Sequence, residues 1–239
     1  MLETVTALLF AHALADFTLQ TNWINTNKAR PHVMALHGLL VLITAHLALG
    51  HLYAPALAVL TLAHLLIDTA KTYSKFNTLS AFLFDQGAHL ATILVVAFWM
   101  PDLWQSGLWS AQPTLLPLMA LAAGLILCLT AGQYAVGLLM RRHSSRMRGA
   151  GLRDGGRQIG LLERGLIFLL VLANQPIGVG FLIAAKSILR YGTANRDQRS
   201  AEYVIIGTLA SFGWAILIAL ATQSLLSVLP PLEIAPRTP

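Results

Sequence analysis

The residues of this sequence that could do chemistry are histidines and aspartates spaced four positions apart within apolar segments. His12 and Asp16 share the pattern Ala-His-x-x-x-Asp with His64 and Asp68, which lie 52 residues further along the chain. Residues four apart lie on one face of a helix, so each histidine and its aspartate can point at a common partner. Imidazole nitrogens and carboxylate oxygens are ligands of divalent metals such as zinc and manganese. The spacing therefore predicts a metal site built inside helices.

Three further residues extend this set to the neighbouring apolar segments. Asp85 and His89 repeat the spacing in reverse order, and His37 stands near the start of the second segment. Counted from the basic end of each segment, all seven residues lie within about 6–17 Å of that end at ~1.5 Å per residue. The predicted metal ligands are His12, Asp16, His37, His64, Asp68, Asp85 and His89. Seven donors exceed the need of one ion, which leaves two arrangements open. The residues could hold two ions, or they could hold one ion with the aspartates outside its ligand shell, where they orient the histidines.

The three carboxylates are the predicted catalytic residues, namely Asp16, Asp68 and Asp85. A metal ion activates water, and a carboxylate or imidazole that does not ligate it can serve as the general base. The alternative is that the histidines and aspartates form hydrogen-bonded pairs that hold helices together. An ionisable group inside a span costs roughly 2.5–3.5 kcal/mol, and three such pairs at one depth favour a functional site over helix packing.

A second polar set lies in the last third of the chain and is predicted to bind substrate. Its members are Glu163, Arg164, Lys186, Arg190 and Glu202. Lys186 and Arg190 are one helical turn apart and share a face, which suits the binding of an anionic group such as a phosphate. Structural ion pairs with the two glutamates, and long side chains that reach to the membrane surface, are the alternative.

The elements that must position these residues follow from composition and apolar runs. The chain has 239 residues, of which 56% are hydrophobic and 11% charged, whereas soluble domains have about 25% charged residues. This composition excludes a soluble globular enzyme and a disordered chain. Apolar segments near the length of about 20 residues that crosses a bilayer lie near 2–21, 33–53, 55–72, 78–100, 113–140, 158–174, 177–191 and 201–226. We therefore predict an all-α, polytopic transmembrane bundle of about eight helices.

The sixth and seventh segments are short and meet at Asn174-Gln175-Pro176, which predicts a tight turn. We expect two thin crossings there, with a re-entrant pair of half-helices as the alternative. The repeated Ala-His-x-x-x-Asp pattern hints at a parallel duplication of the first two helix pairs. The predicted division of the chain is 1–100 for the four-helix part with the site, 101–157 for the fifth helix and a basic loop, 158–226 for three C-terminal helices, and 227–239 for a loose proline-rich tail.

The net charge of +6 comes from basic residues between alternate segments. Twelve Lys and Arg residues follow the first, third, fifth and seventh segments, and the connections 51–54 and 101–112 contain none. The positive-inside rule then places these loops in the cytoplasm and both termini outside it. The lipid bilayer is the expected partner and nucleic acid is not, because the longest basic run lacks interleaved aromatics. The single cysteine, Cys128, excludes an internal disulfide and a cysteine-based zinc site.

These motifs also resemble a known family. His12-x-x-x-Asp16-Phe17-x-Leu19-Gln20, His37-Gly38, His64-Leu65-x-Ile67-Asp68 and Asp85-Gln86-x-x-His89 are similar to motifs of the bacterial membrane-protein family called domain of unknown function 3307. The later stretches Gly160-x-x-Glu163-Arg164, Ala184-Ala185-Lys186-Ser187-Ile188-x-Arg190 and Ala201-Glu202-Tyr203-x-x-x-Gly207-Thr208 resemble its longer members. The resemblance implies a multi-pass protein of the bacterial inner membrane, and it implies no activity.

Three functions remain open on the residues alone. The favoured hypothesis is a metal-dependent hydrolase that acts near the cytoplasmic leaflet on a membrane-associated or anionic lipid substrate, with zinc or manganese as its ion. An ion- or proton-coupled transporter component is the second, because Asp and His inside spans also form ion pathways. A structural membrane protein with His–Asp pairs between its helices is the third.

Overall fold

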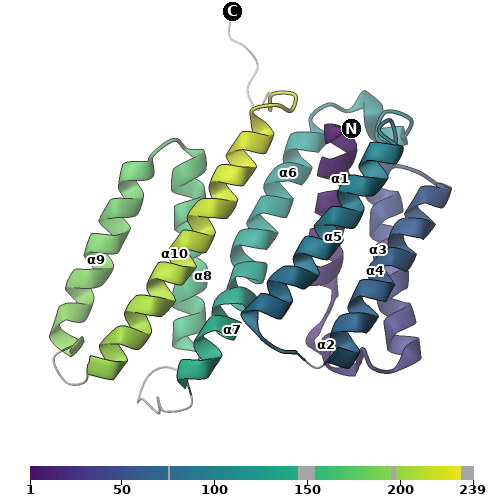
Figure 1. The fold of residues 1–239 in the computed structure, drawn as a ribbon. Coiled ribbons are helices and arrows are strands. Elements are labelled where there is room, and N and C mark those ends of the chain that lie inside the picture. The colour runs from purple at the N-terminus through teal and green to yellow at the C-terminus, as the bar shows by residue number, and fades with distance from the viewer. Residues whose placement is uncertain (75, 145–153, 195–197, 233–239) are drawn as a thin grey trace, which may run out of the picture. The chain divides into compact units, whose positions relative to one another are not determined.

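Every regular element in the described residues is a helix. The structure is a computed structural model that describes residues 1–74, 76–144, 154–194 and 198–232, without the side chains of 142–144, 189–194 and 198–201. Within these ranges the chain runs through successive helices and has no strand (Figure 1). The prediction of an all-α helical bundle is therefore confirmed.

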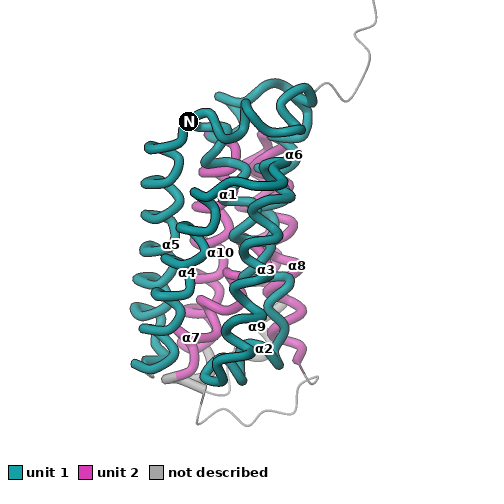
Figure 2. The backbone as a smooth tube through the Cα atoms, turned by 90° about the vertical axis from the view of Figure 1, so that its right-hand side faces the viewer, with its two compact units in different colours: residues 1–126, 225–239 teal, residues 127–224 magenta. Residues whose placement is uncertain are grey.

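The chain divides into two compact units, which Figure 2 shows in different colours. Unit 1 holds residues 1–126 and 225–239, and unit 2 holds residues 127–224. All seven predicted metal ligands belong to unit 1, and the five predicted substrate-binding residues belong to unit 2. The four-part division made from the sequence stays a prediction.

Unit 1 is a bundle in which the first helix packs against three others. Its elements are α1 (Leu2–Leu14), η1 (Ala15–Leu19), α2 (Asn22–Asn27), α3 (Pro31–Leu49), α4 (Pro55–Ser74), α5 (Leu79–Trp99), η2 (Leu108–Ala111) and α6 (Leu115–Ile126). Helix α1 contacts α3, α5 and α6, and α4 contacts α3 and α5. The short helix α2 lies at the end of this bundle opposite the N-terminus (Figures 1 and 2).

Local sequence signals set the ends of these helices. Thr21 precedes α2 and its hydroxyl accepts a hydrogen bond from the backbone N–H of Ile24, at 3.3 Å. Thr78 caps α5 in the same way, accepting from the N–H of Ala81 at 3.2 Å. Such caps satisfy N–H groups that the first helical turn leaves without a partner. Helix α3 ends at Gly50, whose φ of 70° is a left-handed conformation that glycine adopts without strain.

Unit 2 is built from one helix pair and the two helices around it. Its elements are η3 (Leu127–Ala131), α7 (Gly132–Ser144), α8 (Gly155–Leu172), α9 (Pro176–Ala194) and α10 (Gln198–Leu226). Helices α8 and α9 contact each other, and the chain turns between them at Asn174, which has a φ of 57°. The predicted tight turn is confirmed, and α9 begins at Pro176, the last residue of that turn.

Among the described residues, five helical stretches are long and apolar enough to cross a membrane. They are Leu2–Leu19, Pro31–Leu49, Leu79–Trp99, Leu115–Arg141 and Glu202–Leu226. Large apolar side chains on them are exposed, among them Phe84, Phe98 and Leu209. An exposed apolar helix surface is what a lipid environment requires. The helices therefore indicate a membrane protein.

Candidate metal centre

Four helices of unit 1 bring all seven predicted ligands together. Helix α1 and its extension η1 carry His12 and Asp16, and α3 carries His37. The remaining four come from two helices, with His64 and Asp68 on α4 and Asp85 and His89 on α5. All seven side chains are buried, with exposed fractions from 0% for His37 to 8% for His12. Their grouping follows from the spacing, and their role as ligands stays a prediction.

A widened helical turn directs Asp16 into this cluster. The chain becomes π-helical at Ala15–Leu19, where the N–H of Gln20 donates to the carbonyl of Ala15 at 2.9 Å. A π turn takes more residues than an α turn, so it changes the direction in which the following side chains leave the helix. Such turns occur often at functional sites. The sequence gives no signal for this turn beyond the polar residue inside it.

Four donor atoms form the tightest part of the cluster. The Nε2 atoms of His37 and His64 lie 3.0 Å apart. The Oδ1 atom of Asp16 lies 3.5 Å from the first and 3.3 Å from the second. The Oδ2 atom of Asp68 lies 3.0 Å and 3.4 Å from the same two nitrogens. Each of the two oxygens thus lies within 3.5 Å of both nitrogens, and Asp16, His37 and His64 each place one donor atom within 4.8 Å of the others.

A second group of donors shares Asp68 with the first. The other oxygen of this carboxylate, Oδ1, lies 3.9 Å from the Nε2 atom of His89. That nitrogen also lies 3.6 Å from Oδ1 of Asp85. Among the described residues, both ring nitrogens of His89 and Oδ1 of Asp85 have no hydrogen-bond partner although they are buried. Buried polar atoms without partners are rare in folded proteins and call for an explanation.

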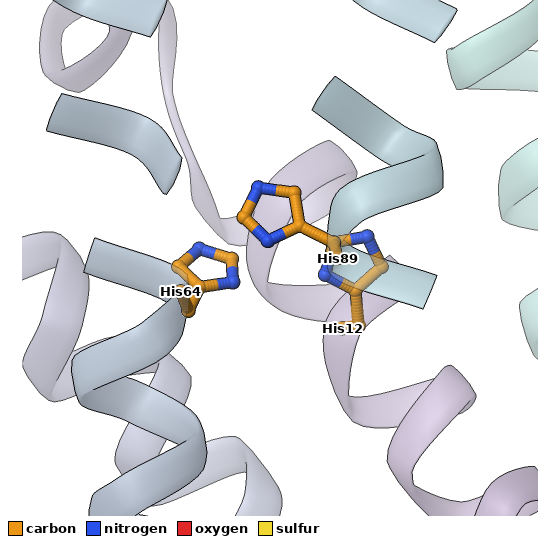
Figure 3. A group of neighbouring side chains, drawn as sticks. All are labelled: His12, His64 and His89. Atoms are coloured by element: carbon orange, nitrogen blue, oxygen red, sulfur yellow. The ribbon is translucent and has the colours of Figure 1, made fainter. Parts of the chain in front are cut away.

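His12 stands beside these groups and faces a small cavity. Figure 3 shows the rings of His12, His64 and His89 gathered from α1, α4 and α5, with ring centres 5.0 Å apart for His12 and His89 and 4.1 Å for His64 and His89. The three rings line a cavity whose other walls are mainly apolar, including Leu8 and Ile93. About 20 Å³ of it is available to the centre of a water molecule, which is room for a water or a single ion.

Gln86 fixes the orientation of His12. The side-chain N–H of Gln86 donates to Oδ2 of Asp85 at 3.0 Å, so its amide oxygen faces the Nε2 atom of His12, 3.2 Å away. That nitrogen must then carry the proton, and Nδ1 keeps its lone pair. Nδ1 lies 3.9 Å from Oδ2 of Asp16. His12 is therefore arranged to accept a proton at Nδ1 and to hold it next to a carboxylate.

Two lysines belong to the site although the sequence analysis counted them only as basic loop residues. Lys28 follows α2 and donates to Oδ2 of Asp68 at 2.6 Å, and Lys71 on α4 donates to Oδ2 of Asp85 at 2.5 Å. The Lys28 side chain is 7% exposed and that of Lys71 34%. Lys71 follows Asp68 by three residues and so lies on the same face of α4, and this spacing is the sequence signal that could have placed Lys71 at the site. No comparable signal exists for Lys28, because α2 folds it back over the bundle end.

The second predicted set forms contacts of its own in unit 2. Lys186 donates to Glu163 at 2.7 Å and lies 5.4 Å from the ring centre of Phe212. Arg164 is buried and donates to the carbonyl oxygens of Cys128 and Leu129, each at 3.0 Å, and to the Ser211 hydroxyl at 3.1 Å.

For Glu202 and Arg190, the other two members of the second set, no specific contact is described. Glu202 is exposed, and the Arg190 side chain lies outside the described part. A role of the five residues in substrate binding stays a prediction, and an anion at Lys186 would compete with Glu163.

Comparison with known proteins places the site within one family domain. Neither a curated protein nor a solved structure matches the chain. Residues 4–114 match the family described as "Protein of unknown function (DUF3307)". This range contains the seven predicted ligands, both lysines and Gln86, and excludes the polar set of unit 2. The site therefore lies in the part of the chain, residues 4–114, that is similar to the DUF3307 family.

Proposed function

We propose that the protein is a membrane-embedded, metal-dependent hydrolase whose ion is held by Asp16, His37, His64 and Asp68. The observation that carries this proposal is the mutual spacing of their four donor atoms, which ranges from 3.0 to 3.5 Å in the five pairs described above. In a tetrahedral zinc site with metal–ligand bonds of about 2.0–2.1 Å, the ligand atoms stand about 3.3–3.4 Å apart. These five separations are therefore close to the edges of a tetrahedral zinc site.

A hydrogen-bonded network accounts for these contacts less well. Each of the two Nε2 atoms can carry one proton, so at most two hydrogen bonds serve five short contacts. Oδ1 of Asp16 is buried and has no hydrogen-bond partner among the described residues. A single cation at the centre satisfies all four donors at once. Zinc and manganese suit this mixture of imidazole and carboxylate ligands.

Charge supports the same conclusion. With the four histidines neutral, as metal binding requires, the three aspartates face two lysine ammonium groups, Lys28 and Lys71, and one negative charge is left over. An unbalanced charge in a buried site is costly. A bound divalent cation changes the net charge of the site from negative to positive. The resulting centre is positive, and it favours an anionic substrate such as a phosphate-bearing lipid. The two lysines are the cations nearest to the site that could contact such a phosphate.

The chemistry of such a centre is the hydrolysis of an ester bond. A bound divalent ion makes water acidic enough to act as a nucleophile near neutral pH. The water oxygen bonds to phosphorus, its proton passes to Nδ1 of His12, and the bond from phosphorus to the leaving oxygen breaks. His12 then returns the proton to that oxygen. The inner bacterial membrane, with the basic loops in the cytoplasm and both termini outside, is the proposed location.

Elemental analysis of the purified protein in detergent tests the metal part. We expect at least one zinc or manganese ion per chain, and we expect Asp16→Asn and His37→Gln to lose it. His46→Gln is the matched control, because His46 also lies on α3 but its Nδ1 contacts only the carbonyl of Leu42, at 2.9 Å. A parent protein without stoichiometric metal, or Asp16→Asn and His37→Gln variants that keep it, would contradict the ligand assignment.

Lipid hydrolysis tests the chemical part separately. The protein is mixed with vesicles of phosphatidylglycerol and phosphatidylethanolamine, and the released phosphate-containing head groups are measured. We expect release that stops with a chelator and returns with added zinc or manganese. A metal-loaded protein that releases nothing from these vesicles but moves the ion across the membrane of proteoliposomes would refute the hydrolase and favour a transporter.

A further inference from the structure

We infer that the site takes a second divalent ion, held by Asp68, Asp85 and His89, with Asp68 bridging the two ions. This inference rests on the proposed metal centre, because Asp68 is shared by both groups. It goes beyond that centre because it assigns a separate ion, a separate set of ligands and the place where water binds.

The unpartnered atoms of the second group are the first argument. His89 is 1% exposed, and within the described part of the chain neither of its ring nitrogens has a hydrogen-bond partner; the same holds for Oδ1 of Asp85, which is also buried. A buried imidazole without any partner loses its hydrogen bonds to water and gains nothing in return. A cation bound at Nε2 of His89 and Oδ1 of Asp85 removes both deficits.

The distances within the second group fit an ion with longer bonds and more ligands. Nε2 of His89 lies 3.6 Å from Oδ1 of Asp85 and 3.9 Å from Oδ1 of Asp68. Around an octahedral ion with bonds of about 2.2 Å, neighbouring ligand atoms stand about 3.1 Å apart and opposite ones about 4.4 Å. Both observed separations are shorter than the roughly 4.4 Å that one such ion can span, so a single ion can bind both pairs of atoms. The three residues are also mutually close enough for one ion, with one donor atom of each within 4.8 Å of the others.

The two oxygens of Asp68 connect the groups. Oδ2 belongs to the tight cluster with His37 and His64, and Oδ1 faces His89. A carboxylate that places one oxygen on each ion is a usual bridge in two-metal centres, where the ions stand about 3.5–4 Å apart. Lys28 and Lys71 do not block the second ion, because both donate to Oδ2 atoms and leave the two Oδ1 atoms open.

The number of donors assigns different roles to the two ions. The first ion has four protein ligands, which is the closed arrangement typical of a structural site. The second has three, so it keeps open positions for water and for a substrate oxygen. The cavity lined by His64 and His89 leaves room for such a water, and His12 lines the same cavity. The second ion is therefore the one that binds the attacking water.

Metal stoichiometry with Mn²⁺ as the probe tests this inference. The purified parent, stripped with a chelator and reloaded with Mn²⁺, is expected to bind about two ions per chain. Asp85→Asn and His89→Gln are expected to bind about one, because the four-donor cluster is intact, and Asp68→Asn about none. The control His46→Gln is expected to match the parent.

Electron paramagnetic resonance of the same samples shows whether two bound Mn²⁺ ions are close together, and in the parent protein it does so without any substitution. Two Mn²⁺ ions bridged by a carboxylate show exchange coupling, whereas a single ion gives the isolated six-line spectrum. We expect the coupled spectrum in the parent and the isolated one in Asp85→Asn. A parent with one uncoupled ion that survives Asp85→Asn and His89→Gln overturns the second ion and leaves the proposed first metal centre standing. A parent without bound Mn²⁺ or zinc overturns both.

Discussion

Replacing Lys28 by methionine removes one partner of the most deeply buried lysine–aspartate pair that the structure describes. The Lys28 side chain is 7% exposed and that of Asp68 4%, and they meet at 2.6 Å. Breaking a buried pair leaves an unpaired charge and costs about 3–5 kcal/mol. In the protein stripped of metal, we therefore expect Lys28→Met to lower the free energy of unfolding by about that amount.

A bound metal ion changes this magnitude in a way that depends on the proposed site. With an ion on Asp68, the carboxylate keeps a positive partner after the lysine is lost. The cost then falls to that of one hydrogen bond, about 1–2 kcal/mol. At roughly 2–4 °C per kcal/mol for a chain of this size, Lys28→Met lowers the melting temperature by roughly 6–20 °C without metal and roughly 2–8 °C with it.

Thermal unfolding followed by the fluorescence of the five tryptophans measures both values. Lys71→Met is the matched control, because Lys71 forms the same kind of pair with Asp85 but is 34% exposed, so water can replace it. Partly exposed pairs contribute about 0–1 kcal/mol. A Lys28→Met cost that equals that of Lys71→Met, or that is the same with and without metal, would refute the reasoning.

Four other perturbations give expected outcomes in the same unfolding assay. Chelation is expected to lower the stability of the parent, by about 2.7 kcal/mol if the ion was present at 100 times its dissociation constant, and to leave Asp68→Asn unchanged. Arg164→Met is expected to cost about 3 kcal/mol, because it removes the donor to a buried carbonyl of Cys128 and to a part-buried carbonyl of Leu129, without changing the metal content of the purified protein. Gly38→Ala is expected to cost about 1–3 kcal/mol, since a Cβ there meets Leu65 at 2.7 Å. Gly87→Ala has nothing within 4 Å and is expected to stabilise by up to about 1 kcal/mol; the reverse order of the two would contradict the packing described.

The helices could be predicted from the sequence because apolar length and turn residues are local signals. The predicted segments 78–100 and 201–226 correspond to α5 (Leu79–Trp99) and α10 (Gln198–Leu226). The predicted turn at Asn174 has the same origin, since Pro176 cannot continue a preceding helix. The grouping of the seven predicted ligands also followed from local periodicity together with a count of depth along each helix.

The parts of the site that sequence reasoning missed depend on non-local geometry. Lys28 reaches Asp68 only because a capped turn of helix, α2, returns the chain over the bundle end. Gln86 was visible in a motif, but its contact with His12 requires α1 and α5 to pack at one particular rotation. The π turn at Asp16 likewise depends on how α1 packs, and helix propensity does not encode it.

X-ray absorption at the metal edge tests the central claim most directly, because it reports the atoms that surround the ion in the purified protein. The arrangement of His37, His64, Asp16 and Asp68 predicts stoichiometric metal with nitrogen and oxygen neighbours at about 2.0–2.2 Å, outer scattering from imidazole rings and no sulfur. Absence of bound metal, a sulfur neighbour, or a shell of oxygen alone without imidazole would contradict the proposed centre.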